Sequence, residues 1–110
     1  MRVVLHPLVD QDLVALVDHI VYVTDGDYVA AGRCLDEVKE LFAAISANPL
    51  FGVRLGPPLD GWMVRHGGRD HRLTLVFRAD LAQDCLFVAL AAFGGQDWMM
   101  ESATRKSFGG

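Results

Sequence analysis

The chain has 110 residues, of which 52% are hydrophobic, and a formal net charge of −4 at pH 7. This length and apolar content fit one domain with a substantial core and exclude a second one, while the acidic balance means that any nucleic-acid binding must rest on a local basic patch. No apolar run approaches the roughly 20 residues that span a bilayer, and the N-terminus MRVVLHPLVDQD lacks the apolar core of a signal peptide. We therefore expect a soluble, cytoplasmic protein that does not bind a membrane.

The N-terminal part of the chain predicts a short strand followed by a helix. Residues 2–6, RVVLH, read as the strand, and Pro7 follows it. Asp10 suits the N-cap of the helix, because an aspartate side chain accepts hydrogen bonds from the free N–H groups of a first helical turn. Apolar residues then recur at helical spacing, at Leu13, Leu16, Val17, Ile20 and Val23.

A second helix is predicted from its N-cap Asp27 to about Ala47, where Asn-Pro ends it. The stretch Thr-Asp-Gly-Asp before it breaks the first helix, so the two helices should form an αα-hairpin. The Gly- and Pro-rich segment at residues 52–61, GVRLGPPLDG, should be a loop that leads into strands. The apolar stripe of the second helix comprises Ala31, Leu35, Val38, Phe42 and Ile45.

Residues 62–80, WMVRHGGRDHRLTLVFRAD, read as a hairpin of two strands, because apolar residues recur there with a period of two. Gly-Gly-Arg-Asp at residues 67–70 supplies the turn. The segment holds four of the ten Lys and Arg residues of the chain and two of its four histidines. Strand alternation predicts a mixed cationic face on the second strand, made of Arg72, Thr74, Val76 and Arg78.

The remaining chain predicts one more strand and a tail. Residues 79–84 form a turn, and residues 85–93, CLFVALAAF, are a continuous apolar run typical of a central strand that is buried on both sides. Residues 96–110 read as a tail. The order strand, helix, helix and three strands predicts an α+β fold.

The two cysteines predict no special chemistry. Cys34 falls in the second predicted helix and Cys85 at the start of the last predicted strand, and neither belongs to a CxxC spacing. Isolated cysteines of this kind are most often small buried apolar groups. The sequence therefore implies no disulfide framework, no metal site and no cofactor.

Four segments carry a resemblance to a known family: AAGRCLDEVKELFAAISANPLFG, GPPLDGWMVR, DHRLTLVFRAD and CLFVALAAFGGQDW. Together with the order of the elements, they resemble the RelE/ParE superfamily of bacterial toxins over residues 3 to about 98. The resemblance implies a single β-α-α-β-β-β domain at residues 1–98, with a helix hairpin packed on a mostly antiparallel sheet. Residues 99–110 would then be a C-terminal tail.

The resemblance implies that the chain is the toxin of a bacterial type II toxin–antitoxin pair, neutralised by a cognate antitoxin protein. Some family members cleave mRNA in the ribosome, whereas the ParE branch blocks DNA gyrase. RNA with the ribosome and DNA gyrase are therefore both candidate targets, and either activity would arrest growth. A homodimer is compatible with the resemblance.

Ribonuclease members of the family hold the scissile phosphate with basic residues after the second helix, on the central strands and near the end of the last strand. The resemblance carries the first two groups to Arg54, Arg65 and Arg72, with Arg78 further along the same strand. The third group is missing, because the chain reads FGGQDW where it would stand. Trp98 in that stretch could stack on a base but cannot transfer a proton.

A general acid or base would have to be His66 or His71, since an unperturbed histidine pKa near 6.5 suits proton transfer at neutral pH. The candidate catalytic set is therefore Arg72, His71, Arg65 and His66. The candidate nucleic-acid contacts are Arg54, Arg78 and Trp98.

Structural interpretations of the same residues stay open. A histidine beside a Gly-Gly turn is usually a solvated polar residue, and strand arginines commonly keep a sheet soluble or pair with acids such as Asp70 and Asp80. His66, His71 and Asp70 have suitable types for metal ligands, but HGGRDH has none of the strong zinc spacings.

The predicted helix hairpin also allows two interpretations. Its apolar stripes most simply cover the sheet. Family members nonetheless offer a groove between the helices and the sheet to an antitoxin helix or strand, to which residues such as Val9, Leu13 and Leu50 would belong. Two function classes follow: a toxin that acts by binding its target or by mRNA cleavage, and a non-catalytic interaction protein that keeps the toxin fold. The missing third basic group and the acidic balance favour binding or a weakened nuclease.

Overall fold

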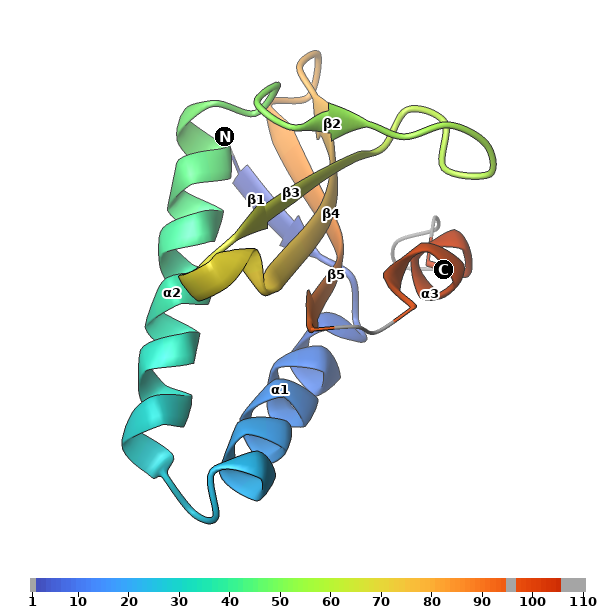
Figure 1. Cartoon of the computed structure of the whole chain (residues 1–110). Helices are drawn as coiled ribbons and strands as arrows, with labels where there is room; N and C mark the ends of the chain where they lie inside the picture. The colour runs from blue at the N-terminus through green and yellow to red at the C-terminus, as the bar shows by residue number, and fades with distance from the viewer. Residues whose placement is uncertain (1, 95–96, 106–110) are drawn as a thin grey trace.

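A helix hairpin packs on one face of a five-stranded sheet in the computed structural model, which describes residues 2–94 and 97–105 (Figure 1). The strand order is β1-β5-β4-β3-β2, with β1 parallel to β5 and the other neighbours antiparallel. The predicted α+β class and the interior position of β5 are confirmed. The elements are β1 Arg2–Leu5, α1 Val9–Val23, α2 Tyr28–Ala47, β2 Val53–Arg54, β3 Met63–Gly67, the 3₁₀ helix η1 Arg69–His71, β4 Leu73–Asp80, β5 Cys85–Phe93 and α3 Trp98–Ala103.

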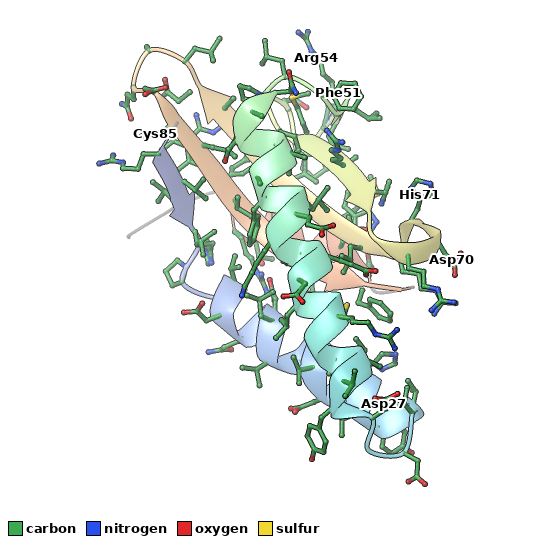
Figure 2. All side chains as sticks on the ribbon, turned by 90° about the vertical axis from the view of Figure 1, so that its left-hand side faces the viewer. Asp27, Phe51, Arg54, Asp70, His71 and Cys85 are labelled. Carbon is green, nitrogen blue, oxygen red and sulfur yellow. The ribbon has the colours of Figure 1, made fainter. Side chains whose placement is uncertain are left out.

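Local hydrogen bonds set the two helix starts. Asp27, at the tip of the hairpin, caps α2 as predicted, because its carboxylate accepts a hydrogen bond from the Ala30 N–H at 2.9 Å (Figure 2). Asp10 does not cap α1, which begins one residue before it. The Leu8 N–H donates instead to Nδ1 of His6 at 3.1 Å. Asp10 lies in the first turn, where its negative charge interacts favourably with the positive end of the helix dipole.

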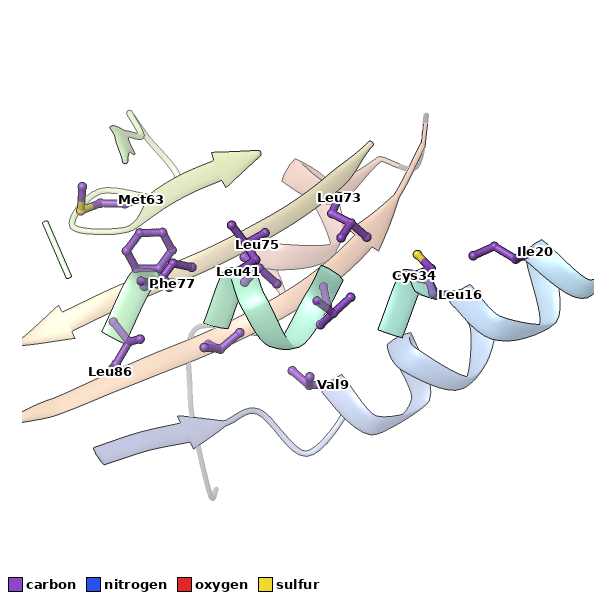
Figure 3. Packing of buried hydrophobic residues seen from close by; sticks show 14 of the residues in the cluster. Val9, Leu16, Ile20, Cys34, Leu41, Met63, Leu73, Leu75, Phe77 and Leu86 are labelled. Atoms are coloured by element: carbon purple, nitrogen blue, oxygen red, sulfur yellow. The ribbon is translucent and has the colours of Figure 1, made fainter. Parts of the chain in front are cut away.

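The face of the sheet beneath the hairpin carries the larger core (Figure 3). Phe77 of β4 and Leu86 of β5 are fully buried there, as is Ile45 of α2. Cys34 packs in the same core and Cys85 is also buried, so both cysteines are small buried groups, as predicted. The other members of this core include Val9, Leu16, Ile20, Ala31, Val38, Leu41, Met63, Leu73, Leu75, Val88 and Ala91.

A second, smaller core lies on the opposite face of the sheet, where Figure 1 shows α3. It contains Leu59, Trp62, Val64, Val76, Ala89, Leu90 and Ala92, with Trp98 and Ala103 of α3 packed against them. Residues 99–103, predicted to lie in a tail, belong to α3. The predicted cationic face of β4 points into this core. That face is buried instead, with Thr74 4% and Val76 0% exposed. Of the predicted tail, residue 96 and residues 106–110 lie outside the described residues.

A buried ion pair fastens the C-terminal segment to α1. The Arg105 guanidinium donates to both carboxylate oxygens of Asp12, at 2.6 and 3.0 Å, and the two side chains are 9% and 10% exposed. Arg105 also donates to the Ala89 carbonyl at 3.2 Å, while Asp12 accepts from the Ala91 N–H at 3.1 Å.

This ion pair completes the edge of β5. The pairing of β1 with β5 ends at Leu5 and Val88, so β5 continues alone on that side. The register with β4 passes from Val88 to Leu90, which makes Ala89 a β-bulge. Side chains from α1 and the segment after α3 therefore satisfy backbone groups that a longer β1 would otherwise pair, and buried backbone groups require such partners.

Candidate functional site

Arg65 lies on the helix-hairpin side of β3. It is paired with Leu75, a member of the larger core, and residues directly opposite each other on antiparallel strands share a face. Its guanidinium lies 4.4 Å from the centre of the Phe51 ring. This cation–π contact ties Arg65 to the loop after α2, away from the other predicted catalytic residues.

His66 lies on the opposite face of β3, next to α3. Its Nδ1 lies 2.8 Å from Oγ1 of Thr74, and its ring meets the edge of the Trp98 ring at a centroid distance of 6.1 Å. The structure therefore brings together two of the predicted site residues, His66 and Trp98. Trp98 is half-buried and packs against the smaller core, so α3 fixes its position.

Arg78 stacks on two aromatic rings on the same face of the sheet as His66. Its guanidinium lies 4.8 Å from the centre of the Phe87 ring and 5.5 Å from that of Trp62. Phe87 and Trp62 both belong to the smaller core. Arg78 lies near the end of β4 that is remote from His66, because His66 pairs with Thr74.

Arg72 and His71 lie in the turn that precedes β4. Asp70 and His71 adopt left-handed backbone conformations, with φ of 57° and 55°, and they turn the chain before the strand starts at Leu73. Arg72 is thus outside the strand, and the expectation that it shares a face with Arg78 is wrong. Its side chain makes an exposed ion pair with Asp70 at 3.6 Å.

Arg54 is exposed on the edge strand β2, where it lines a shallow cleft with Leu50 and Met63. Figure 2 shows it at the same end of the molecule as Phe51, well apart from His71. The predicted residues therefore occupy three separate places: the α3 face, the β2 edge and the turn before β4. A single phosphate cannot contact all of these guanidinium groups, which weakens the case for a shared phosphate-cleaving centre.

An apolar groove runs between α1 and α2. It encloses about 470 Å³. Asp18 and Lys39 are its charged members, one on each helix. Its other lining residues are Leu13, Val14, Val17, Leu35, Val38 and Phe42. Because Val14 is 61% exposed, part of this apolar surface is open to solvent.

A second, polar cleft of about 360 Å³ lies where the hairpin meets the turn before β4. Arg72 is the only predicted site residue there. His19 of α1, Arg33 of α2 and Arg69 also line the cleft, and none of them was a predicted site residue. Arg33 directly precedes the buried Cys34 in α2, but only the packing of the hairpin on the sheet brings it to the same cleft as Arg69 and Arg72.

Among the residues described, no three His, Cys, Asp or Glu side chains gather closely enough to hold a metal ion. Within the same ranges, the helices are too short or too polar to cross a membrane. No protein-family model matches the chain, and no curated protein matches it.

Proposed function

We propose that this chain is the toxin of a bacterial type II toxin–antitoxin pair of the RelE/ParE kind, and that it arrests growth by binding a protein target such as DNA gyrase. The observation that carries the proposal is the apolar groove between α1 and α2. A solvent-open apolar surface on a small domain is the usual mark of a protein-binding site. The order of elements, with a helix hairpin on a mostly antiparallel sheet, agrees with the resemblance to that superfamily.

The antitoxin is the proposed occupant of the groove. An amphipathic helix recognises such a groove by inserting apolar side chains at helical spacing, while charged residues at the margins fix its direction. Leu13 lines the groove and so belongs to the proposed surface. Val9 is 0% exposed and cannot contact a partner, and Leu50 lies outside the groove beside β2, so neither belongs to the proposed surface.

The predicted basic residues lie far apart on the domain, which supports a toxin that binds a protein target over one that cleaves mRNA. Cleavage requires preorganised cations around one phosphate and a group that transfers a proton. Arg65 contacts Phe51 on one face of the sheet, whereas His66 contacts Thr74 on the other. Arg72 lies in the turn between the strands.

A growth assay tests both parts of the proposal. Inducible expression of the chain alone should arrest bacterial growth, and co-expression of the small protein encoded beside it should restore growth. Val14→Asp places a charge in the groove and should leave the arrest intact while abolishing its rescue. Val29→Asp is the matched control, because Val29 is 74% exposed on α2 and does not line the groove.

The outcomes separate the alternatives. Normal growth on expression of the chain alone would favour a non-catalytic interaction protein that keeps the toxin fold. Rescue of Val14→Asp as complete as that of wild type would place the antitoxin elsewhere. Loss of intact mRNA in extracts, without inhibition of gyrase supercoiling, would favour the ribonuclease branch.

A further inference from the structure

The polar cleft gathers residues from four elements. His19 comes from α1, Arg33 and Glu37 from α2, Arg69 from η1, and Phe93 from the end of β5. Its volume of about 360 Å³ lies within the range of roughly 300–1,000 Å³ that is typical of small-molecule sites. The cleft is therefore large enough for a compact ligand.

Positive charge dominates the cleft. Three arginines, Arg33, Arg69 and Arg72, line the cleft together with one acidic residue, Glu37. Throughout residues 2–94 and 97–105, the side chains of Arg33 and Arg69 form no ion pair or hydrogen bond, and Arg72 has only its exposed contact with Asp70. In a chain with a net charge of −4, the three arginines outnumber the two nearby carboxylates, those of Glu37 and Asp70.

One wall of the cleft is apolar and aromatic. The rings of His19 and Phe93 lie 5.7 Å apart, tilted by 54°, and Ile20 and Val23 extend the apolar surface. Cys34 also lines the cleft. Burial is the main cause that raises the pKa of its thiol to about 11, and the negative charge of Glu37 contributes to the increase. The thiol is therefore neutral at pH 7 and does not repel an anion.

We propose that this cleft binds a nucleoside phosphate. Guanidinium groups recognise phosphate through paired N–H donors, and three of them can neutralise a dianion. A flat base packs against Phe93 and His19, as aromatic rings commonly do with nucleobases. Glu37 supplies the acceptor that sugar hydroxyl groups require. The inference concerns a small ligand and does not depend on the proposed toxin function.

Isothermal titration calorimetry of the full chain tests this inference with adenosine monophosphate, adenosine and inorganic phosphate. The monophosphate should bind at least about tenfold more tightly than either part alone, because each part makes only half of the contacts. Arg33→Ala and Arg69→Ala should each weaken its binding roughly tenfold, since each removes charged hydrogen bonds. Phe93→Leu keeps the apolar volume and should weaken binding of the monophosphate but not of inorganic phosphate.

Arg2→Ala is the matched control, because Arg2 pairs with Cys85 at the opposite end of β5 from Phe93. It should leave the affinity unchanged. The inference is wrong if the monophosphate does not bind, if inorganic phosphate binds as tightly, or if Arg2→Ala weakens binding as much as Arg33→Ala. Thermal unfolding of each variant ensures that a lost affinity does not reflect a lost fold.

Discussion

Arg105 and the arginines of the polar cleft use the same side chain in opposite ways. Arg105 is 9% exposed and is held by Asp12 and a backbone carbonyl. Arg72 is 60% exposed and has one contact, at 3.6 Å, while Arg33 and Arg69 form no side-chain ion pair within the described parts of the chain. The first arrangement stabilises the fold, whereas the second leaves charge available to a ligand.

The difference follows from desolvation. A buried guanidinium has lost its water, so its partners must replace every strong hydrogen bond, and removing one partner leaves an uncompensated charge. An exposed guanidinium keeps its water, and its ion pairs contribute only about 0–1 kcal/mol. Burial and hydrogen bonding therefore distinguish a structural arginine from a candidate binding arginine in this chain, where sequence alone treats them alike.

Removal of Arg105 should have the largest effect. Arg105→Ala should lower the free energy of unfolding by about 3–5 kcal/mol, because it leaves the Asp12 carboxylate buried without its cation. Urea unfolding followed by circular dichroism measures the loss. The double variant Asp12→Ala/Arg105→Ala should lose clearly less than the sum of the two single variants. Strictly additive losses would mean that the pair does not act as a unit.

Removal of Arg72 should barely change stability. Arg72→Ala should alter the free energy of unfolding by no more than about 1 kcal/mol, because its ion pair with Asp70 is exposed. The same variant separates the two toxin branches: the ribonuclease interpretation predicts that growth arrest is abolished, whereas target binding predicts that it persists. We expect persistence. A variant that unfolds would show that the turn before β4 is structural.

The smallest effect on stability should come from the titration of His6, whose pKa responds to the charges of Arg105 and Asp12. Burial lowers the pKa of His6 below 6.5, the positive charge of Arg105 lowers it further, and Asp12 acts in the opposite direction. The folded chain then binds fewer protons than the unfolded chain near pH 6.5, so stability should fall as the pH drops through 6.5 towards the lower pKa of the folded state. NMR titration measures this pKa directly, and a value at or above 6.5 would contradict the assignment.

His6→Asn provides the control for the pH effect. An asparagine carbonyl can replace Nδ1 of His6 as the acceptor for the Leu8 N–H, but it does not titrate. The decrease in unfolding free energy between pH 7.5 and 5.5 should therefore be smaller in the variant than in wild type. An equal decrease in both proteins would assign the pH dependence to other groups.

Much of the fold could be predicted because its signals are local. Asp27 precedes an apolar stripe of helical spacing, and the structure has both the cap and the helix to Ala47. The continuous apolar run at residues 85–93 is the interior strand β5. The helix α3 was missed although Asp97 caps it by accepting from the Met100 N–H, since six residues give too little periodicity to identify a helix.

The candidate site was harder to predict, because alternation along a strand requires knowing where the strand begins. Arg72 was predicted to share a face with Arg78. Left-handed conformations at Asp70 and His71 instead form a turn, so that β4 begins only at Leu73. Turns of this kind depend on backbone conformations that Asp and His adopt only in a favourable context. The alternation itself holds from Leu73 onward, so only Arg72, which precedes the strand, leaves the predicted face.

The sequence by itself determined the α+β class, the helix hairpin, the interior strand and the small buried cysteines, because hydrophobic period and capping act over a few neighbouring residues. Tertiary structure alone decided which charged groups meet. Asp12 and Arg105 are 93 positions apart, and the cleft draws its residues from both helices, the turn and β5. No local pattern encodes such encounters, since they arise only when separate elements pack to bury their apolar faces.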